Sequence, residues 1–468
     1  METQNKGLNL FALIALIVSS IIGGGIFNLM SDMANTASAG ATLIGWLVAG
    51  VGMGSLAFCI QNLNAKRPDL DAGIYSYARE GFGNYMGFNS IWGYWVSVIL
   101  GNVAFGTLMF SAIGYFIPIF EGGQNIYAII GASVVLWLIH VLILKGIEKA
   151  SFVNTIVTIT KLVPLALFLV FVIFAFKSNI FTENFWGTLS RNFEFGNVIE
   201  QVKGTMLITV WVFIGIEGAV VFSSRAKKRS DVGKATIIGF ATVTLIYMLV
   251  TVLSYGIMTQ DELRNLPQPA MAYVLESVIG KAGAVIVNIG VIISILGAWI
   301  SCTLLAEESG YQAAKNETFP KPFLKENKEG APIVSLLVTN VIVQLFLFSF
   351  LFTDKAYTLM ASLSSSMILI PYAFIAFYQV KYTFQTKGNA DFMRNAILGI
   401  VSSLYMLWLL YASGVWYLLL TVLLFAPGTL IYIWVRKSYQ KKVFTKIESV
   451  IAMIFAILFV VCIWQLVM

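Results

Sequence analysis

Charged residues are scarce in this sequence of 468 residues: lysine, arginine, aspartate and glutamate together make up 11%. A soluble globular domain carries about 25% charged residues, so the low charge excludes an ordinary soluble fold. Cysteine occurs three times and histidine once. The cysteines lie inside apolar runs without metal-ligand spacing, so we expect no metal site and no cofactor. No nucleophile–base pair or phosphate loop is present either, which argues against an enzyme.

Long apolar runs dominate the chain, and 58% of its residues are hydrophobic. Runs of about twenty residues match bilayer-spanning helices, whereas barrel strands alternate over about ten residues. The sequence therefore predicts an all-α polytopic membrane protein. The first run is long, broken by glycines and lacks a small-residue cleavage site, so it is not a signal peptide. We expect about thirteen transmembrane helices, at 8–30, 41–62, 88–118, 126–144, 152–176, 204–224, 235–257, 282–306, 333–353, 357–379, 395–412, 415–435 and 447–468.

Basic residues gather in alternate connections between these runs. Most of the 30 lysines and arginines fall on one side if the N-terminus is cytoplasmic. This bias is the positive-inside pattern of membrane proteins. The net charge of +7 therefore reports topology and does not indicate nucleic-acid binding. The partners we expect are the lipid bilayer and small solutes.

Three consecutive glycines, Gly23, Gly24 and Gly25, lie in the middle of the first apolar run. Glycine weakens a helix by about 0.5–1 kcal/mol per residue. An opened helix in a membrane leaves bare amide groups, which are tolerated where they line a protein-enclosed cavity and which suit a substrate carboxylate. The alternative is close helix packing through small residues.

A second interruption, at residues 211–219, includes Gly215 and shifts the balance toward a transport site. The two interruptions fall in the first and sixth spans. Broken helices at matching positions of two halves are typical of inverted-repeat transporters. We expect a transport core over 1–380, with repeats at about 8–176 and 204–379. The remaining helices, at 381–468, flank the core or contact a second subunit, so a homodimer is possible.

Two charged residues fall inside predicted spans. Glu217 follows the second interruption, and it could pair with a cationic substrate, gate access or exchange a proton. The alternative is a protonated side chain bonded to free backbone. Lys161 could release a proton or act as a fixed cation near the first break; snorkelling to the interface is the alternative. Charges inside membrane helices usually mark substrate or ion pathways.

Three further residues within the spans suit a site for a polar cation. Asn102 could bond a substrate or join two helices. Trp211 and Trp299 lie inside spans, away from the interfacial belts where tryptophan gathers. An indole face attracts guanidinium or ammonium groups by about 2 kcal/mol once desolvated. Each tryptophan could also be an ordinary core aromatic residue.

Five sequence motifs occur in a characteristic order. They are Gly-Gly-Gly-Ile-Phe at 23–27, Asp-Ala-Gly-Ile-Tyr-Ser-Tyr-Ala at 71–78, Gly-Asn at 101–102, Trp-Val-Phe-Ile-Gly-Ile-Glu-Gly at 211–218 and Gly-Ala-Trp at 297–299. Together they resemble the amino acid–polyamine–organocation superfamily, and in particular its bacterial basic amino acid/polyamine antiporters. The match extends over the first ten spans. The segments 40–46, 81–88 and 225–236 look closest to the arginine/ornithine antiporters, which the thirteenth span also suits.

This resemblance implies a five-plus-five inverted-repeat fold and exchange of one solute for another. Its implied residues are the carboxylate site Ile21, Gly24 and Gly25, the further substrate contacts Asn102, Trp211, Ile214 and Trp299, and the gating positions Tyr94 and Glu217. Lys161 resembles a lysine placed where sodium sits in sodium-coupled relatives, which implies that no sodium is needed. The sequence departs from the arginine/agmatine pattern at Gly24, where a serine is expected, and in residues 29–31, which lack a proline.

The sequence thus predicts a cationic amino acid antiporter of the bacterial cytoplasmic membrane, with arginine entering and ornithine leaving. Alternatives within transport are a lysine/cadaverine or histidine/histamine exchanger, or a proton-coupled permease. A membrane nutrient sensor is the alternative outside transport, although the short loops argue against it.

Overall fold

The computed structural model describes residues 9–70, 74–146, 161–217, 228–353, 355–386, 388 and 391–467. Within these ranges the ordered elements are helices, and ten of the helices are long and apolar enough to cross a membrane. The all-α, multi-pass prediction is therefore confirmed. The chain forms two compact units, and each is described by itself: unit 1 contains 1–71, 162–287 and 379–406, and unit 2 contains 72–161, 288–378 and 407–468.

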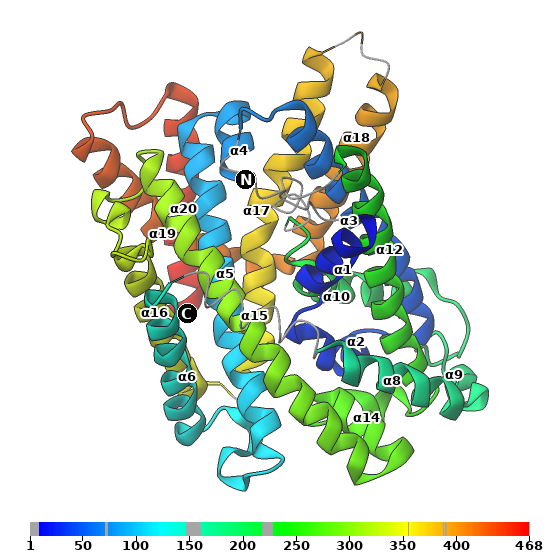
Figure 1. Ribbon diagram of the computed structural model, residues 1–468. Coiled ribbons are helices and arrows are strands. Elements are labelled where there is room, and N and C mark those ends of the chain that lie inside the picture. The colour runs from blue at the N-terminus through cyan, green and yellow to red at the C-terminus, as the bar shows by residue number, and fades with distance from the viewer. Residues whose placement is uncertain are drawn as a thin grey trace, which may run out of the picture. The chain divides into compact units, whose positions relative to one another are not determined.

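Unit 1 contains the first, interrupted span. α1 packs along α12, and both α10 and α12 pack against α3 (Figure 1). Its complete helices are α1 (Leu10–Ile21), η1 (Gly24–Phe27), α2 (Leu29–Ala34), α3 (Ala39–Lys66), α8 (Leu162–Ala175), α9 (Ser178–Glu183), α10 (Phe195–Phe213), α12 (Arg229–Ser254), α13 (Gln260–Arg264) and α14 (Ala270–Ile279). α18 (Phe392–Ala412) lies mostly in this unit.

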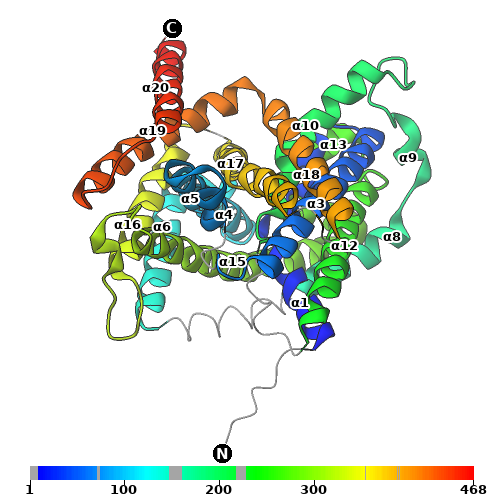
Figure 2. The same ribbon diagram turned by 90° about the horizontal axis from the view of Figure 1, so that it is seen from above.

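Unit 2 is built around α5 (Asn84–Gly114), whose residues are almost all buried. α4, α6, α16 and α19 pack on it, and α20 contacts α19 (Figure 2). The other elements are α4 (Ile74–Phe82), η2 (Pro118–Gly123), α6 (Ile126–Leu144), η4 (Lys321–Leu324), α16 (Ile333–Leu347), η5 (Phe348–Leu351), α19 (Gly414–Ser438) and α20 (Lys446–Val467). Most of α15 (Lys281–Lys315) and of α17 (Ala356–Gln385) also belongs here.

The helix ends follow the predicted spans closely where hydropathy changes sharply. The fourth predicted span coincides with α6. α15 continues nine residues beyond its predicted end at 306, because its last turns are polar on one side only and still form helix. The short helices α4, α9, α13 and α14 lie between spans and were not predicted. The count of thirteen and the inverted repeat stay predictions, since parts of the fifth and sixth spans fall outside the described residues.

The additional C-terminal helix is tied to α5 through one carboxylate. Glu448, in the first turn of α20, accepts a hydrogen bond from the Tyr85 backbone N–H at 2.8 Å and another from Thr445 N–H at 2.7 Å. Gly83 leaves room for this contact, because a Cβ there would lie 2.8 Å from Glu448 Oε1. An acidic side chain at the N-terminus of a helix satisfies amides that have no intrahelical acceptor. The C-terminal region therefore stabilises the central helix of unit 2.

Candidate functional site

The first membrane span is broken in unit 1, as the glycine triplet predicts. α1 ends at Ile21, Gly23 is extended with φ −102° and ψ −160°, and one turn of 3₁₀ helix follows at Gly24–Phe27. The first N–H groups of a helix have no acceptor within it. Among the described residues, the amides of Gly23, Gly24 and Gly25 donate to no backbone acceptor outside η1. The break therefore presents adjacent amide donors inside the unit.

Trp211 of α10 lies directly against this break. A Cβ placed on Gly25 would be 2.6 Å from the indole Nε1 and 3.1 Å from Val212 Cγ1. A Cβ on Gly23, in contrast, would meet no atom within 4 Å. The break thus has one face closed by the indole at Gly25, whereas the Cβ position of Gly23 is open.

This difference predicts that two alanine substitutions differ in their effect on stability. Gly25→Ala is expected to displace the Trp211 indole and to lower the melting temperature, since overpacking of a tight site costs about 1–3 kcal/mol. Gly23→Ala is the matched control and should melt close to wild type. Thermal unfolding of both purified variants in detergent checks this, and equal melting temperatures for the two would contradict the packing described.

The second break approaches the end of α1. α10 ends at Phe213, Ile214 turns to ψ 131°, and Gly215 takes φ +106°. A Cβ on Gly215 would lie 2.6 Å from the carbonyl oxygen of Ser20. Glycine is the residue that adopts this φ without strain, and no larger residue would allow the two backbones to come this close. The sixth span is thus interrupted where predicted, and its continuation beyond Glu217 lies outside the described residues.

One tyrosine that the sequence analysis passed over links both breaks. The Tyr247 hydroxyl, on α12, lies 3.0 Å from the Ile21 carbonyl oxygen and 2.9 Å from that of Val212. These carbonyls belong to the last turns of α1 and α10, where backbone acceptors lack intrahelical donors. The side chain is fully buried, and its ring packs against Trp46 and Phe213 with centroids 5.9 and 5.6 Å apart. A single hydroxyl proton is therefore shared between the two broken helices.

The Glu217 side chain contacts the backbone of the break that precedes it in the sequence. Its Oε2 accepts a hydrogen bond from the Gly215 N–H at 3.2 Å. The side chain is partly exposed. This contact agrees with the structural alternative, in which the carboxyl group caps free backbone. It leaves the predicted roles in cation pairing, gating and proton exchange open as predictions.

Unit 2 brings together two of the other predicted residues. Asn102 Nδ2, on α5, donates to Thr303 Oγ1 on α15 at 3.3 Å, and that hydroxyl donates to the Trp299 carbonyl at 2.8 Å. Both Asn102 and Trp299 are fully buried. Within the described chain, Asn102 Oδ1 and Trp299 Nε1 have no hydrogen-bond partner. An acceptor and a donor thus remain available beside the indole, and Thr303 is a connecting residue that spacing did not reveal.

The two remaining predicted residues lie elsewhere in unit 2. Tyr94 is buried on α5, eight residues before Asn102 and hence about 12 Å away along the helix. Lys161 is also buried. Cys302 on α15 is close enough to interact electrostatically with it. The predicted roles of Tyr94 and Lys161 stay predictions.

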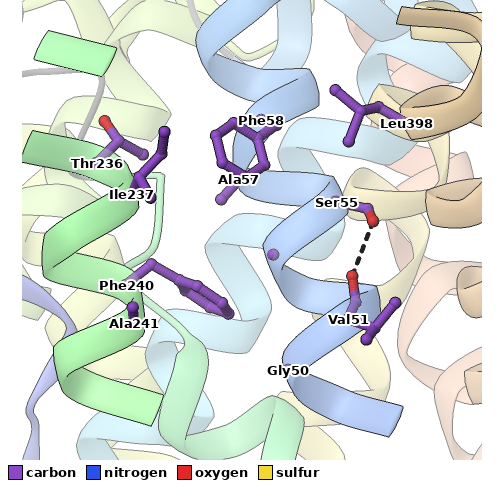
Figure 3. Close-up of a pocket in the computed structure, with 11 residues that line it drawn as sticks. Gly50, Val51, Ser55, Ala57, Phe58, Thr236, Ile237, Phe240, Ala241 and Leu398 are labelled. Carbon is purple, nitrogen blue, oxygen red and sulfur yellow. Dashed lines mark hydrogen bonds between the residues drawn. The ribbon is translucent and has the colours of Figure 1, made fainter. Parts of the chain in front are cut away.

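A separate groove of unit 1 contains none of the predicted site residues. It has a volume of about 240 Å³ and is lined by α3, α12 and Leu398 of α18 (Figure 3). Phe58, Ile237 and Phe240 supply apolar walls, and the Ser55 hydroxyl bonds to its own helix at Val51 O. The groove offers no unused charge, so it does not resemble a site for a charged solute.

A multi-pass helical protein with two spans interrupted beside each other has the architecture of secondary transporters. Comparison with known sequences places the chain within that class. A profile of the amino acid permease family matches residues 8–431, and the chain belongs to this family.

Three relatives resemble nearly the whole chain. An arginine/ornithine antiporter of Pseudomonas aeruginosa is 48% identical, covering 96% of this chain and 95% of the relative. An arginine/ornithine antiporter of Latilactobacillus sakei is 43% identical, with coverage of 100% and 98%. An arginine/agmatine antiporter of Chlamydia pneumoniae is 42% identical, with coverage of 97% and 95%. The predicted superfamily is thereby confirmed.

Proposed function

We propose that this protein is an antiporter of cationic amino acids, which takes up arginine and releases ornithine across the bacterial cytoplasmic membrane. The single observation that carries the proposal is the near full-length similarity to arginine/ornithine antiporters. The two adjoining breaks of unit 1 support it, because a zwitterionic solute needs donors for its carboxylate within the membrane. The N-terminus is cytoplasmic in this proposal, in agreement with the positive-inside bias.

The carboxylate of the substrate would bind the amides at Ile21 and at Gly23 to Gly25, beside Trp211, Ile214 and Gly215. A Cβ at Gly23 would meet no atom within 4 Å, which supports this position. Asn102 and Trp299 stay predicted substrate contacts, since an indole face suits a guanidinium or ammonium group. Tyr94, Lys161 and Glu217 would serve access and charge compensation.

Counterflow in proteoliposomes tests the exchange. Vesicles loaded with radiolabelled ornithine should lose the label rapidly when external arginine is added and slowly when it is absent. Arginine and ornithine carry the same charge at neutral pH, so a potassium diffusion potential should leave the rate unchanged. Equal uptake of arginine into empty vesicles would contradict obligatory exchange.

The same vesicles separate the alternatives. Agmatine lacks a carboxylate and carries one more positive charge than arginine, so an arginine/agmatine exchange would respond to the potential. Preferential exchange with lysine and cadaverine, or with histidine and histamine, would assign a different substrate pair. Uptake into empty vesicles driven by a pH gradient would indicate a proton-coupled permease, and binding without any transport would indicate a sensor.

A further inference from the structure

α15 carries a buried carboxyl group that the proposed exchange has not yet used. Glu307 is 1% exposed and lies in a helix long and apolar enough to span the membrane. Its position one residue past the predicted end of the span at 306 hid it from the sequence analysis. Acidic side chains at such positions are rare, because desolvation of their charge is costly, and they generally face a pathway or pair with another group.

One oxygen of the Glu307 carboxyl group, Oε2, is buried and has no hydrogen-bond partner in the described part of the chain. The Ser335 hydroxyl of α16 donates to the Glu307 backbone carbonyl at 2.6 Å and not to its side chain. Among the described residues, the neighbouring charge on this carboxyl group is that of Glu308, which has the same sign. No lysine or arginine of the described chain forms an ion pair with this buried carboxyl group.

Glu307 lies on the same face of α15 as Trp299 and Thr303, which were described above. Trp299, Thr303 and Glu307 follow one another at four-residue intervals and so lie along one stripe of α15. Glu307 is about 6 Å along the axis from Thr303 and about 12 Å from Trp299. The direction from Trp299 to Glu307 leads to the end of α15 at Lys315, which the charge distribution places in the cytoplasm.

We propose that the Glu307 carboxylate is a transient binding site for the positively charged side chain of the substrate on the cytoplasmic half of its path. The proposal rests on the exchange of cationic amino acids proposed above. A lysine or arginine of the protein held permanently at this carboxylate would neutralise it and exclude the substrate. A guanidinium or ammonium group that arrives and leaves supplies the missing charge in each half of the exchange cycle.

The decisive comparison is between two neighbouring glutamates. Glu307→Gln removes the buried charge with little change in volume, and Glu308→Gln removes the adjacent exposed charge as a matched control. We expect Glu307→Gln to slow arginine/ornithine counterflow roughly tenfold or more, because the variant binds the charged side chain of the substrate more weakly. Glu308→Gln should remain within about twofold of wild type. Glu307→Asp keeps the charge and should recover most of the lost rate.

A neutral analogue distinguishes substrate pairing from proton binding. Citrulline has the shape of arginine with an uncharged urea group, so competition by both compounds measures recognition of the charge. We expect Glu307→Gln to lower the preference for arginine over citrulline roughly tenfold, whereas Glu308→Gln preserves it. Size-exclusion profiles of the three variants verify that each is folded.

Three results would overturn this assignment. The first is wild-type counterflow in Glu307→Gln, with the wild-type protein active. The second is an equal loss of competition by arginine and by citrulline, which indicates a proton site or a structural role. The third is a loss in Glu307→Asp as large as in Glu307→Gln, because the charge would then not be the cause. If the wild-type protein shows no exchange, the proposed function itself is wrong, and the binding role of Glu307 is wrong with it.

Discussion

Replacing Tyr247 by phenylalanine is expected to slow exchange roughly tenfold, equivalent to about 1.4 kcal/mol of barrier, and to lower the melting temperature. The substitution preserves the aromatic contacts of the ring with Trp46 and Phe213. It removes the hydroxyl proton shared by the carbonyls of Ile21 and Val212. A buried acceptor left without its donor costs about 1–3 kcal/mol. Counterflow and thermal unfolding of the purified variant measure the two effects.

Tyr255 provides the control, because it lies just after the end of the same helix and its hydroxyl is used differently. It donates to the Ala37 carbonyl at 2.6 Å and lies 3.1 Å from Thr42 Oγ1, away from both breaks. Tyr255→Phe should lower the melting temperature while leaving exchange close to wild type. If both variants lose stability alike and neither changes the exchange rate, Tyr247 contributes to folding alone and does not position the breaks.

Gly215→Ala should have a larger effect and abolish exchange. At φ +106° an alanine occupies a backbone region that costs about 1–3 kcal/mol. In addition, its Cβ would lie 2.6 Å from the Ser20 carbonyl oxygen, so the two breaks would have to separate. The backbone strain and the close contact with Ser20 affect the same few residues. We therefore expect a strongly destabilised protein without measurable counterflow.

Gly196→Ala is the matched control for this substitution. Gly196 lies in the first turn of α10, and a Cβ there would meet nothing within 4 Å. Alanine at an ordinary helical glycine is neutral or stabilises by up to about 1 kcal/mol, so this variant should exchange and melt like wild type. Normal exchange by Gly215→Ala would show that the close approach to Ser20 is not needed.

The site residues were predictable where the signal was local. Gly23, Gly24 and Gly25 interrupt an apolar run, and that alone indicates an opened helix. Asn102 and Trp299 attracted notice because an amide and an indole are unusual within spans, and both are buried in unit 2. Thr303, which connects them, has no comparable signal, since a threonine within a membrane helix usually bonds to its own backbone.

Tyr247 and Glu307 show why other site residues were missed. Tyr247 is one of 19 tyrosines, and its importance comes from two carbonyls, 226 and 35 residues away in the sequence. Glu307 stands next to Glu308 at the polar end of an apolar run, where the pair resembles a solvated helix end. Only the packing of α15 shows that one of the two is buried and the other exposed.

The sequence by itself determined the membrane class, the positions of most spans and the place of the two interruptions. Hydropathy and the conformational freedom of glycine act over a few residues, so they can be read without knowledge of distant contacts. The tertiary structure decided which atoms meet at the breaks: Gly25 with Trp211, Gly215 with Ser20, and Tyr247 with both. These contacts depend on how separate helices pack, and the order of residues along one helix does not specify the neighbour that it faces.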